Sequence, residues 1–413
     1  MTEFYKEPST MEPLFPENIA ELEQLSITLI EKASALSKAI HPITGRAIAD
    51  FLRPMNSYYT NLIEGHDTHP IDIEKALKED FSRDLKNRSL QLEAKAHIKL
   101  SKDIFDKFNK EKINPYSIDF IKNVHKEFYD HLPEEFRIAK SLTDKDVEII
   151  PGEIRTCEVQ VGRHIAPHWA SLPLFLERFE SFYNPTLGDN ANNRIRRIIT
   201  IAASHHRLAW IHPFADGNGR VVRLFSDACL INEHLNETGL WSMSRGLARN
   251  ENKYKVCLAN ADSQRWNDYD GRGNLSNKAL LAFCKFFLET AIDQVVFMTG
   301  VLDIDNMLKR IHSFVDLMVS KKELKTETRY ILENVFLKGE ITKKEAERLT
   351  GKSDKTAKLI AESLIKKDLL KLDSSNHLSP YRVSYPISLS PILFPGLYPS
   401  NKELDMFTKI NER

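Results

Sequence analysis

The residues best suited to take part in a chemical reaction lie in one short stretch, HPFADGNGRVVR, from His212 to Arg223. Within it, Gly217-Asn218-Gly219 stands where a new helix is expected to open. Glycines let the backbone turn sharply and approach a ligand closely. The N–H groups of a first helical turn lack internal acceptors, and the helix dipole favours an anion beside them. A phosphate is therefore the ligand that this turn is expected to bind.

Four side chains around the turn could handle a nucleotide triphosphate. Asp216 could hold Mg²⁺, which prefers one or two carboxylates together with phosphate oxygens. Arg220 and Arg223 are three residues apart on one helix face and could neutralise the outer phosphates through forked hydrogen bonds. His212 could accept a proton from an incoming hydroxyl near neutral pH. The alternative is that these residues only end one helix and cap the next.

Two predicted helices position this loop. One covers residues 191–210 and the other starts near Gly219, because apolar residues recur in both at helical spacing. Further helices are expected at 117–131, 250–261 and 276–322. Residues 1–115 also read as mostly helical, with interruptions at Pro54, around Gly65 and at Pro70.

A segment rich in Val, Ile and Thr precedes the long helix. Residues 148–162 have this composition and contain Pro151-Gly152, a turn signal, so a short β-hairpin is predicted there. The remainder of the segment to Tyr183 is expected to be irregular.

The C-terminal part has a different pattern. Helices are predicted at 326–337, at 343–350 and from an N-cap at Ser353 to 367, with 341–342 as a short strand or cap. Two strands, 369–372 and 381–383, are expected around Asn376. This order predicts a winged helix, followed by an extended, packed tail.

The winged helix has two open interpretations. Its third helix, the expected recognition helix, carries several lysines that could contact DNA phosphates, namely Lys352, Lys355, Lys358, Lys366 and Lys367. Acidic residues dilute this charge, and the helix has no arginine to read guanine. Since winged helices also bind proteins or dimerise, DNA and protein partners both remain open.

Composition sets the remaining limits. The 413 residues can form two or three domains, and Lys plus Arg equals Asp plus Glu at 58 each, so net charge favours no partner class. The 4 cysteines show no disulfide or zinc spacing. We expect no signal peptide, no membrane span and a cytoplasmic location. Apart from His212, the histidines at 164, 168, 205 and 206 are expected to be structural, because adjacent residues on a helix point to different sides.

The stretch from His212 to Arg223 resembles the signature of the Fic family, H-P-F-x-[DE]-G-N-G-R-x-x-R, at every specified position. Members transfer AMP from ATP to a Ser, Thr or Tyr hydroxyl of a protein, so the resemblance implies an enzyme, a protein adenylyltransferase. By that analogy His212 takes the hydroxyl proton and Asp216 holds Mg²⁺. The amides of residues 217–219 steady the transferring group, and the two arginines of the motif hold the leaving pyrophosphate. Tyr254 is expected to line the adenine pocket or its rim, with simple packing as the alternative.

Two further segments are similar to Fic family motifs. Residues 60–65, TNLIEG, match an inhibitory motif, [ST]-x-x-x-E-[GN], which implies that Glu64 pairs with Arg223 and restrains ATP binding. The alternative is an ordinary glutamate before a C-capping glycine. Residues 155–162 resemble the family's flap, in which Val159, Gln160, Val161 and Gly162 would dock a strand of the target. A plain structural hairpin is the alternative.

Together these inferences predict a mainly α fold: a Fic-type helical core with a β-hairpin flap, plus a C-terminal winged helix-turn-helix domain. The expected units are an N-terminal helical region with the inhibitory helix, a catalytic core, a connecting helix, the winged helix and a tail, at 1–115, 116–300, 301–325, 326–388 and 389–413. The expected ligands are ATP, Mg²⁺ and a hydroxyl-bearing protein, with dimerisation open. Rival functions are AMP removal, with Glu64 positioning a water, transfer of another phosphate-containing group, or a nucleotide-sensing DNA-binding regulator.

Overall fold

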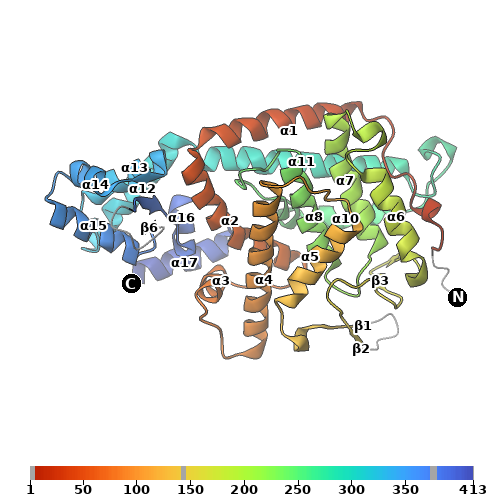
Figure 1. The fold of residues 1–413 in the computed structure, drawn as a ribbon, viewed down its shortest axis with the longest axis horizontal. Helices are drawn as coiled ribbons and strands as arrows, with labels where there is room; N and C mark the ends of the chain where they lie inside the picture. The colour runs from red at the N-terminus through yellow and green to blue at the C-terminus, as the bar shows by residue number, and fades with distance from the viewer. Residues whose placement is uncertain (1–4, 141–145, 373–378, 413) are drawn as a thin grey trace.

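The computed structural model describes residues 5–140, 146–372 and 379–412 of a mainly helical chain (Figure 1). The helices are α1 (Ala20–Ala39), α2 (Pro42–Ile63), α3 (Pro70–Leu77), α4 (Leu85–Phe108), α5 (Ile118–Asp130), α6 (Leu172–Tyr183), α7 (Arg194–Ile211), α8 (Asn218–Asn232), α9 (Met243–Arg249), α10 (Glu251–Ala261), α11 (Asn277–Val301), α12 (Ile304–Ser320), α13 (Thr328–Lys338), α14 (Lys343–Thr350), α15 (Asp354–Lys366), α16 (Ser390–Leu393) and α17 (Ser400–Glu412). The strands are β1 (Ile138–Lys140), β2 (Asp146–Glu148), β3 (Gln160–Val161), β4 (His164–Ile165), β5 (Glu340–Ile341), β6 (Leu370–Leu372) and β7 (Tyr381–Val383).

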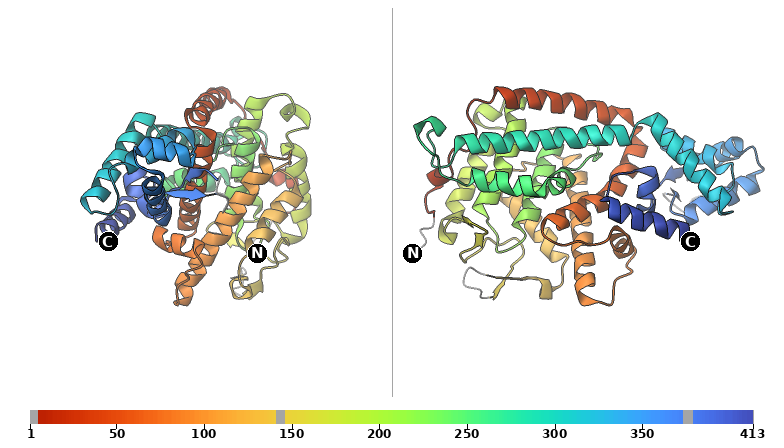
Figure 2. Two further views of the ribbon diagram at one scale, coloured as in Figure 1. Left: turned by 60° about the vertical axis from the view of Figure 1, so that its left-hand side comes forward. Right: turned by 180° about the vertical axis from the view of Figure 1, so that it is seen from behind.

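The loop that carries the motif lies between two buried helices. Helices α7 and α8 pack against each other and bury most of their side chains, which confirms the predicted helix pair. Helix α11 packs on α7, and α1 lies along α11, as both views show (Figures 1 and 2). Helices α4 and α5 pack on α8 from another direction. The loop between α7 and α8 is therefore held by a shell of helices.

Helix α2 is longer than the sequence suggested. Pro54 was expected to interrupt the helical pattern, and this prediction was wrong, because Pro54 lies inside α2. Proline removes one hydrogen bond from a helix interior. The helix is nevertheless kept by burial against α4, α8 and α9, which outweighs the local preference. Gly65, with φ +85°, follows its last turn.

Three other expectations need correction. The segment expected to be irregular contains α6, whose apolar residues do recur at helical spacing. The helix expected over 276–322 is two helices, because Asp303 caps α12 by accepting a hydrogen bond from the N–H of Asn306 at 3.0 Å. The expected extended tail contains α16 and α17, and α17 starts directly after the last proline, Pro399.

The hairpin predicted over 148–162 with a turn at Pro151-Gly152 is wrong in position, because the observed hairpin spans 160–165. β3 pairs with β4 around Gly162, which has φ +59°. Pro151-Gly152 does not form the hairpin turn. Gly152 instead packs on α5, where its N–H donates to His125 Nδ1 at 2.9 Å. A Cβ there would lie 2.9 Å from the Cβ of Lys126, so this glycine serves close packing. A separate pair, β1 with β2, lies before it.

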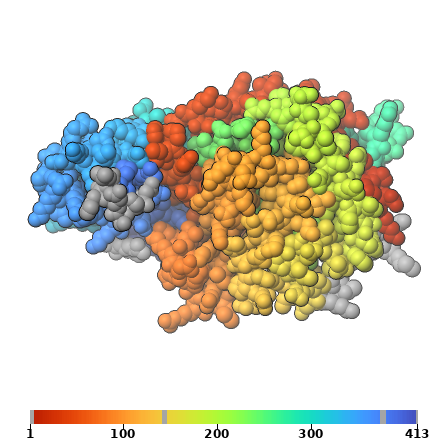
Figure 3. Space-filling view, in the orientation of Figure 1, coloured from red at the N-terminus to blue at the C-terminus, as the bar shows by residue number. Residues whose placement is uncertain are grey.

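The C-terminal unit forms a lobe at one end of the molecule (Figure 3). Helices α13, α14 and α15 accompany an antiparallel sheet in the order β5-β7-β6. Thr342 and Glu345 form a capping box at the start of α14. The predicted turn at Asn376 lies outside the described residues. The helices and strands expected here are confirmed.

This lobe contacts the start of α2 directly. The hydroxyl of Thr44 donates to the carbonyl of Phe336 at 2.7 Å. Gly339, with φ +82°, lies so close that a Cβ would fall 2.4 Å from the Cβ of Ile43. None of the helices in the described part of the chain combines the length and apolar character that crossing a membrane requires.

The contact at Gly339 can be tested by substitution. Gly339→Ala should lower the free energy of unfolding by about 1–3 kcal/mol more than Gly351→Ala, because it adds overpacking to backbone strain. Gly351 is a matched control, since it has φ +61° but open space around its Cβ position. Denaturant midpoints of the two variants provide the measurement. Equal losses would show that α13 and α2 are not in close contact.

Candidate active site

His212 ends helix α7 in a left-handed conformation, with φ 50° and ψ 62°. Its carbonyl accepts a hydrogen bond from Arg155 Nε at 2.8 Å, which fixes the backbone at this point. Burial lowers the pKa of His212 to about 4, and the neighbouring His164 and Arg155 add to the effect. The imidazole is therefore neutral at pH 7 and free to accept a proton.

The turn before α8 is closed by the side chain of Asn218. Asn218 Oδ1 accepts from the N–H of Phe214 at 2.9 Å, and its Nδ2 donates to the carbonyl of the same residue at 2.8 Å. Phe214 is buried and stacks on His125, so its side chain anchors the loop. Gly217 has φ +78°, and a Cβ there would lie 2.9 Å from the ring of Tyr129. These contacts present the first-turn N–H groups of α8 as an anion cradle.

Asp216 stands beside this cradle with its side chain half exposed (52 %). Tyr129 donates its hydroxyl proton to Asp216 Oδ2 at 2.7 Å, and Arg220 lies 3.6 Å from the same oxygen. Burial would raise the pKa of Asp216, but Arg220 and Tyr129 keep it below its ordinary value. The carboxylate is therefore ionised. No group of three or more His, Cys, Asp and Glu side chains arranged to hold a metal occurs among the described residues.

Arg223 is the most constrained charge of the site, with 3 % of its side chain exposed. Its Nε donates to Thr60 Oγ1 at 2.6 Å, and an Nη donates to Glu64 Oε1 at 2.5 Å. Burial would raise the pKa of Glu64, but Arg223 and Arg220 hold it below its usual value. Glu64 is thus an anion paired with Arg223.

Glu64 also lies directly against the cradle. A Cβ at position 219 would fall 2.3 Å from Glu64 Oε1, so only glycine at 219 permits this approach. Residues 60 and 64 come from the end of α2, and residues 219 and 223 come from the first turns of α8. The structure therefore brings the two separate sequence motifs into direct contact.

The sequence analysis missed three residues of the site, namely Glu93 on α4, Tyr129 on α5 and His66 just after α2. Glu93 Oε2 lies 3.4 Å from an Nη of Arg220 and 2.8 Å from His66 Nδ1. The side-chain hydrogen bond to Glu93 raises the pKa of His66, although burial opposes the effect. A signal was available, because Glu93 and His97 share helical spacing with Leu100 and Ile104 and so lie on a buried face.

The predicted flap is attached to the same site. The N–H of Arg155 donates to the carbonyl of Pro213 at 3.0 Å, and His164 Nε2 hydrogen-bonds with the carbonyl of Trp210 at 2.7 Å. Within the flap, Val159 is buried, whereas Gln160, Val161 and Gly162 are exposed. The exposed tip therefore lies on a segment that is fixed to the residues flanking His212.

Tyr254, His205 and His206 lie in the helical core. The Tyr254 hydroxyl hydrogen-bonds with His205 Nε2 at 2.8 Å, and His205 Nδ1 with Ser226 at 2.7 Å. His206 hydrogen-bonds with the carbonyl of Leu258. Tyr254 is buried, which favours the packing alternative for this residue. His205 and His206 have structural partners, as expected.

The link between His66 and Glu93 predicts a pH-dependent stability. Because the folded-state pKa of His66 is raised, its contribution is fully present below the unfolded value of about 6.5 and is lost as pH rises through the folded value. At pH values below about 6, His66→Gln should therefore lower the urea concentration at the midpoint of unfolding. Above about pH 8 the same substitution should have little effect on that midpoint. Urea unfolding at both values measures this, and an equal loss at both would contradict it.

Comparison with known proteins gives the chain its relatives. Residues 115–230 match the sequence model of the Fic/DOC family. The chain is 38% identical over 80 residues to "Protein adenylyltransferase Fic" of Drosophila grimshawi and of Drosophila melanogaster, which is 19% of this chain and 16% and 15% of those proteins. The match thus spans about a sixth of their length.

A solved structure extends the likeness in fold. The crystal structure of a Fic family protein from Desulfovibrio desulfuricans G20 matches 92% of this chain and 98% of its own, with a TM-score of 0.50 and 16% identity. At that identity the likeness concerns the fold alone. Residues 115–230 are therefore similar in sequence to the Fic/DOC family, and the fold of the chain is similar to that of a Fic family protein.

Proposed function

We propose that the chain transfers AMP from ATP to a Ser, Thr or Tyr hydroxyl of a protein, including its own, and that Glu64 restrains this activity. The observation that carries the proposal is the neutral imidazole of His212 beside a helix-start anion cradle flanked by Arg220 and Arg223. The named adenylyltransferase relatives support a transferase over the Fic domain region.

The proposed step uses this chain's residues as follows. The hydroxyl oxygen of the target forms a bond to the α-phosphorus, and its proton passes to His212. The bond from that phosphorus to the β-phosphate oxygen breaks, and pyrophosphate leaves. The first-turn amides of residues 217–219 stabilise the charge on the transferring group. Arg220 and Arg223 bind the leaving phosphates by charge-assisted hydrogen bonds.

A magnesium ion fits the residues present. Asp216 offers one ionised, half-exposed carboxylate at the edge of the cradle, which suits an ion that takes its other ligands from phosphates and water. When bound, Mg²⁺ would neutralise part of the triphosphate charge. Tyr129 would orient the carboxylate through its hydrogen bond.

The restraint is proposed to act through Arg223. Glu64 and Thr60 occupy the Nε and one Nη of this guanidinium, so these donors are not available to a terminal phosphate. The Glu64 carboxylate also lies against Gly219, where it would repel an anion in the cradle. Glu64 must therefore move before a triphosphate binds productively.

Two further assignments rest on placement. We propose that Gln160, Val161 and Gly162 dock a strand of the target, supported by their exposure on a segment fixed beside His212. We also propose that residues 326–388 form a winged-helix domain, supported by three helices and the β5-β7-β6 sheet.

Removing the restraint should increase activity. Glu64→Gly should raise self-labelling from radiolabelled ATP at least about tenfold, since a charge-assisted hydrogen bond that competes with phosphate is worth about 1.5–3 kcal/mol. Adding His212→Ala should abolish the labelling. Glu111→Gly is the matched control, because Glu111 is also an exposed glutamate just beyond a helix. The proposal fails if Glu64→Gly labels no faster than the parent.

The acid limb of the pH–rate profile provides a separate test. Because burial lowers the pKa of His212 to about 4, the Glu64→Gly protein should keep its rate down to about pH 5. The rate should then fall as the imidazole becomes protonated. An acid limb centred near the ordinary histidine value of about 6.5 would show that His212 is not the buried base.

A further inference from the structure

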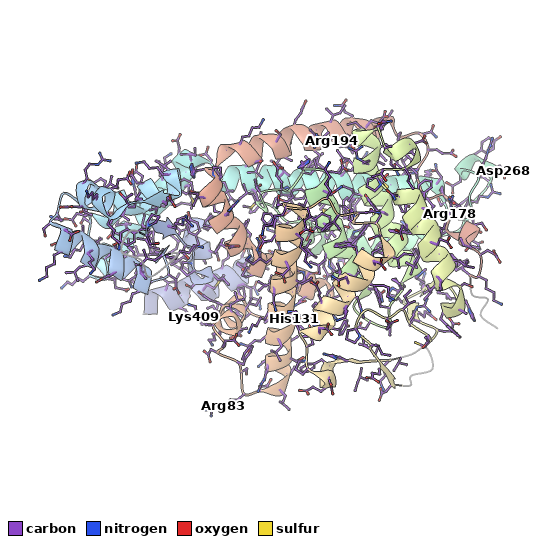
Figure 4. The ribbon with its side chains drawn as sticks, in the orientation of Figure 1. Arg83, His131, Arg178, Arg194, Asp268 and Lys409 are labelled. Atoms are coloured by element: carbon purple, nitrogen blue, oxygen red, sulfur yellow. The ribbon has the colours of Figure 1, made fainter. Side chains whose placement is uncertain are left out.

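A cavity lies where the C-terminal lobe meets the N-terminal helices, and none of the residues 212–223 lines it. It has a volume of about 450 Å³ and lies between α3, α12, the end of α15 and α17. Its interior is apolar. The apolar lining consists of Phe314 and Met318 on α12, Met406 on α17, and Leu369 and Leu389 from the segment between α15 and α16. Lys409, labelled in Figure 4, marks its edge on α17. The volume is within the range of small-ligand sites.

The edge of this cavity is basic. Five lysines line it, and three carboxylates accompany them: Lys75, Lys78, Lys366, Lys367, Lys409, Glu74, Glu323 and Asp368. The carboxylates are already engaged. Asp368 pairs with Lys78 at 2.7 Å, Glu323 pairs with Lys367 at 2.5 Å, and Glu74 lies 3.7 Å from Lys78. The lining therefore carries an excess of positive charge.

Lys366 is the available cation. It is exposed at the last residue of α15, and within the described residues no carboxylate lies within ion-pair distance of it. Lys75 and Lys409 have carboxylate partners outside the lining, Asp72 and Asp405. An incoming anionic group thus finds one unpaired ammonium at the edge and apolar side chains behind it.

We propose that this cavity binds a small amphipathic anion, a molecule with an apolar body and a single carboxylate at one end. The apolar body would bury against Phe314, Met318 and Leu389, which gains hydrophobic free energy in proportion to the area covered. The carboxylate would pair with Lys366. A neutral molecule of the same shape lacks that pairing, and a cationic one is repelled by the edge. The proposal does not depend on the nucleotide chemistry proposed above.

The test uses the full chain and titration calorimetry with octanoate and its neutral counterpart octanol. Octanoate should bind at one site per chain, about threefold more tightly than octanol, because an ion pair with an exposed lysine is worth up to about 1 kcal/mol. Lys366→Gln should weaken octanoate binding about threefold and leave octanol unchanged. Lys355→Gln is the matched control, since Lys355 is exposed on the same helix and does not line the cavity.

Filling the cavity provides the second arm. Met406→Trp should abolish binding of both ligands, and Ile410→Trp at the edge serves the same purpose if the first variant does not fold. Equal affinities for octanoate and octanol would overturn the proposal. It would also be overturned if Lys366→Gln behaved like Lys355→Gln, or if the folded Trp variant bound octanoate as the parent does.

Discussion

The site is organised by one ion pair, between the buried Arg223 and the partly exposed Glu64. A guanidinium with 3 % of its side chain exposed needs a partner, because leaving such a charge unpaired costs about 3–5 kcal/mol. Glu64 and Thr60 supply that partner from α2 in the present conformation. A bound phosphate would supply it equally well. The restraint and the proposed substrate therefore compete for the same stabilising interaction.

Other features of the site follow from the need to bring α2 against α8. Gly219 has no side chain because the Glu64 carboxylate occupies the space of its Cβ. Arg220, which lies three residues before Arg223 on α8, faces α4 and pairs with Glu93 instead. Each arginine of the motif thus meets a carboxylate from a different N-terminal helix. His66, two residues beyond Glu64, connects these two carboxylate-bearing elements through its bond to Glu93.

The cradle was predictable because its residues are contiguous, so their spacing alone fixed their relation on a helix start. The partnership of Glu64 and Arg223 needed the family resemblance, since 159 residues separate them. Glu93 and Tyr129 were missed because their contacts depend on the packing of α4 and α5 against α8, which no local pattern reports. Pro54 and α17 show the opposite error, because prolines suggested breaks in structure that did not occur. Pro54 lies inside α2, which is held by tertiary packing, and α17 begins after the last proline of the tail.

Helix α2 gives the C-terminal lobe a physical connection to the site. It spans roughly 33 Å at 1.5 Å per residue, with Thr44 fastened to Phe336 at one end and Thr60 fastened to Arg223 at the other. Pro54 divides it into two stiff segments with a weaker joint between them. A shortened protein lacking the lobe would leave the first segment uncovered, so its properties would be those of a different molecule. Dissecting this protein therefore calls for point substitutions rather than truncation.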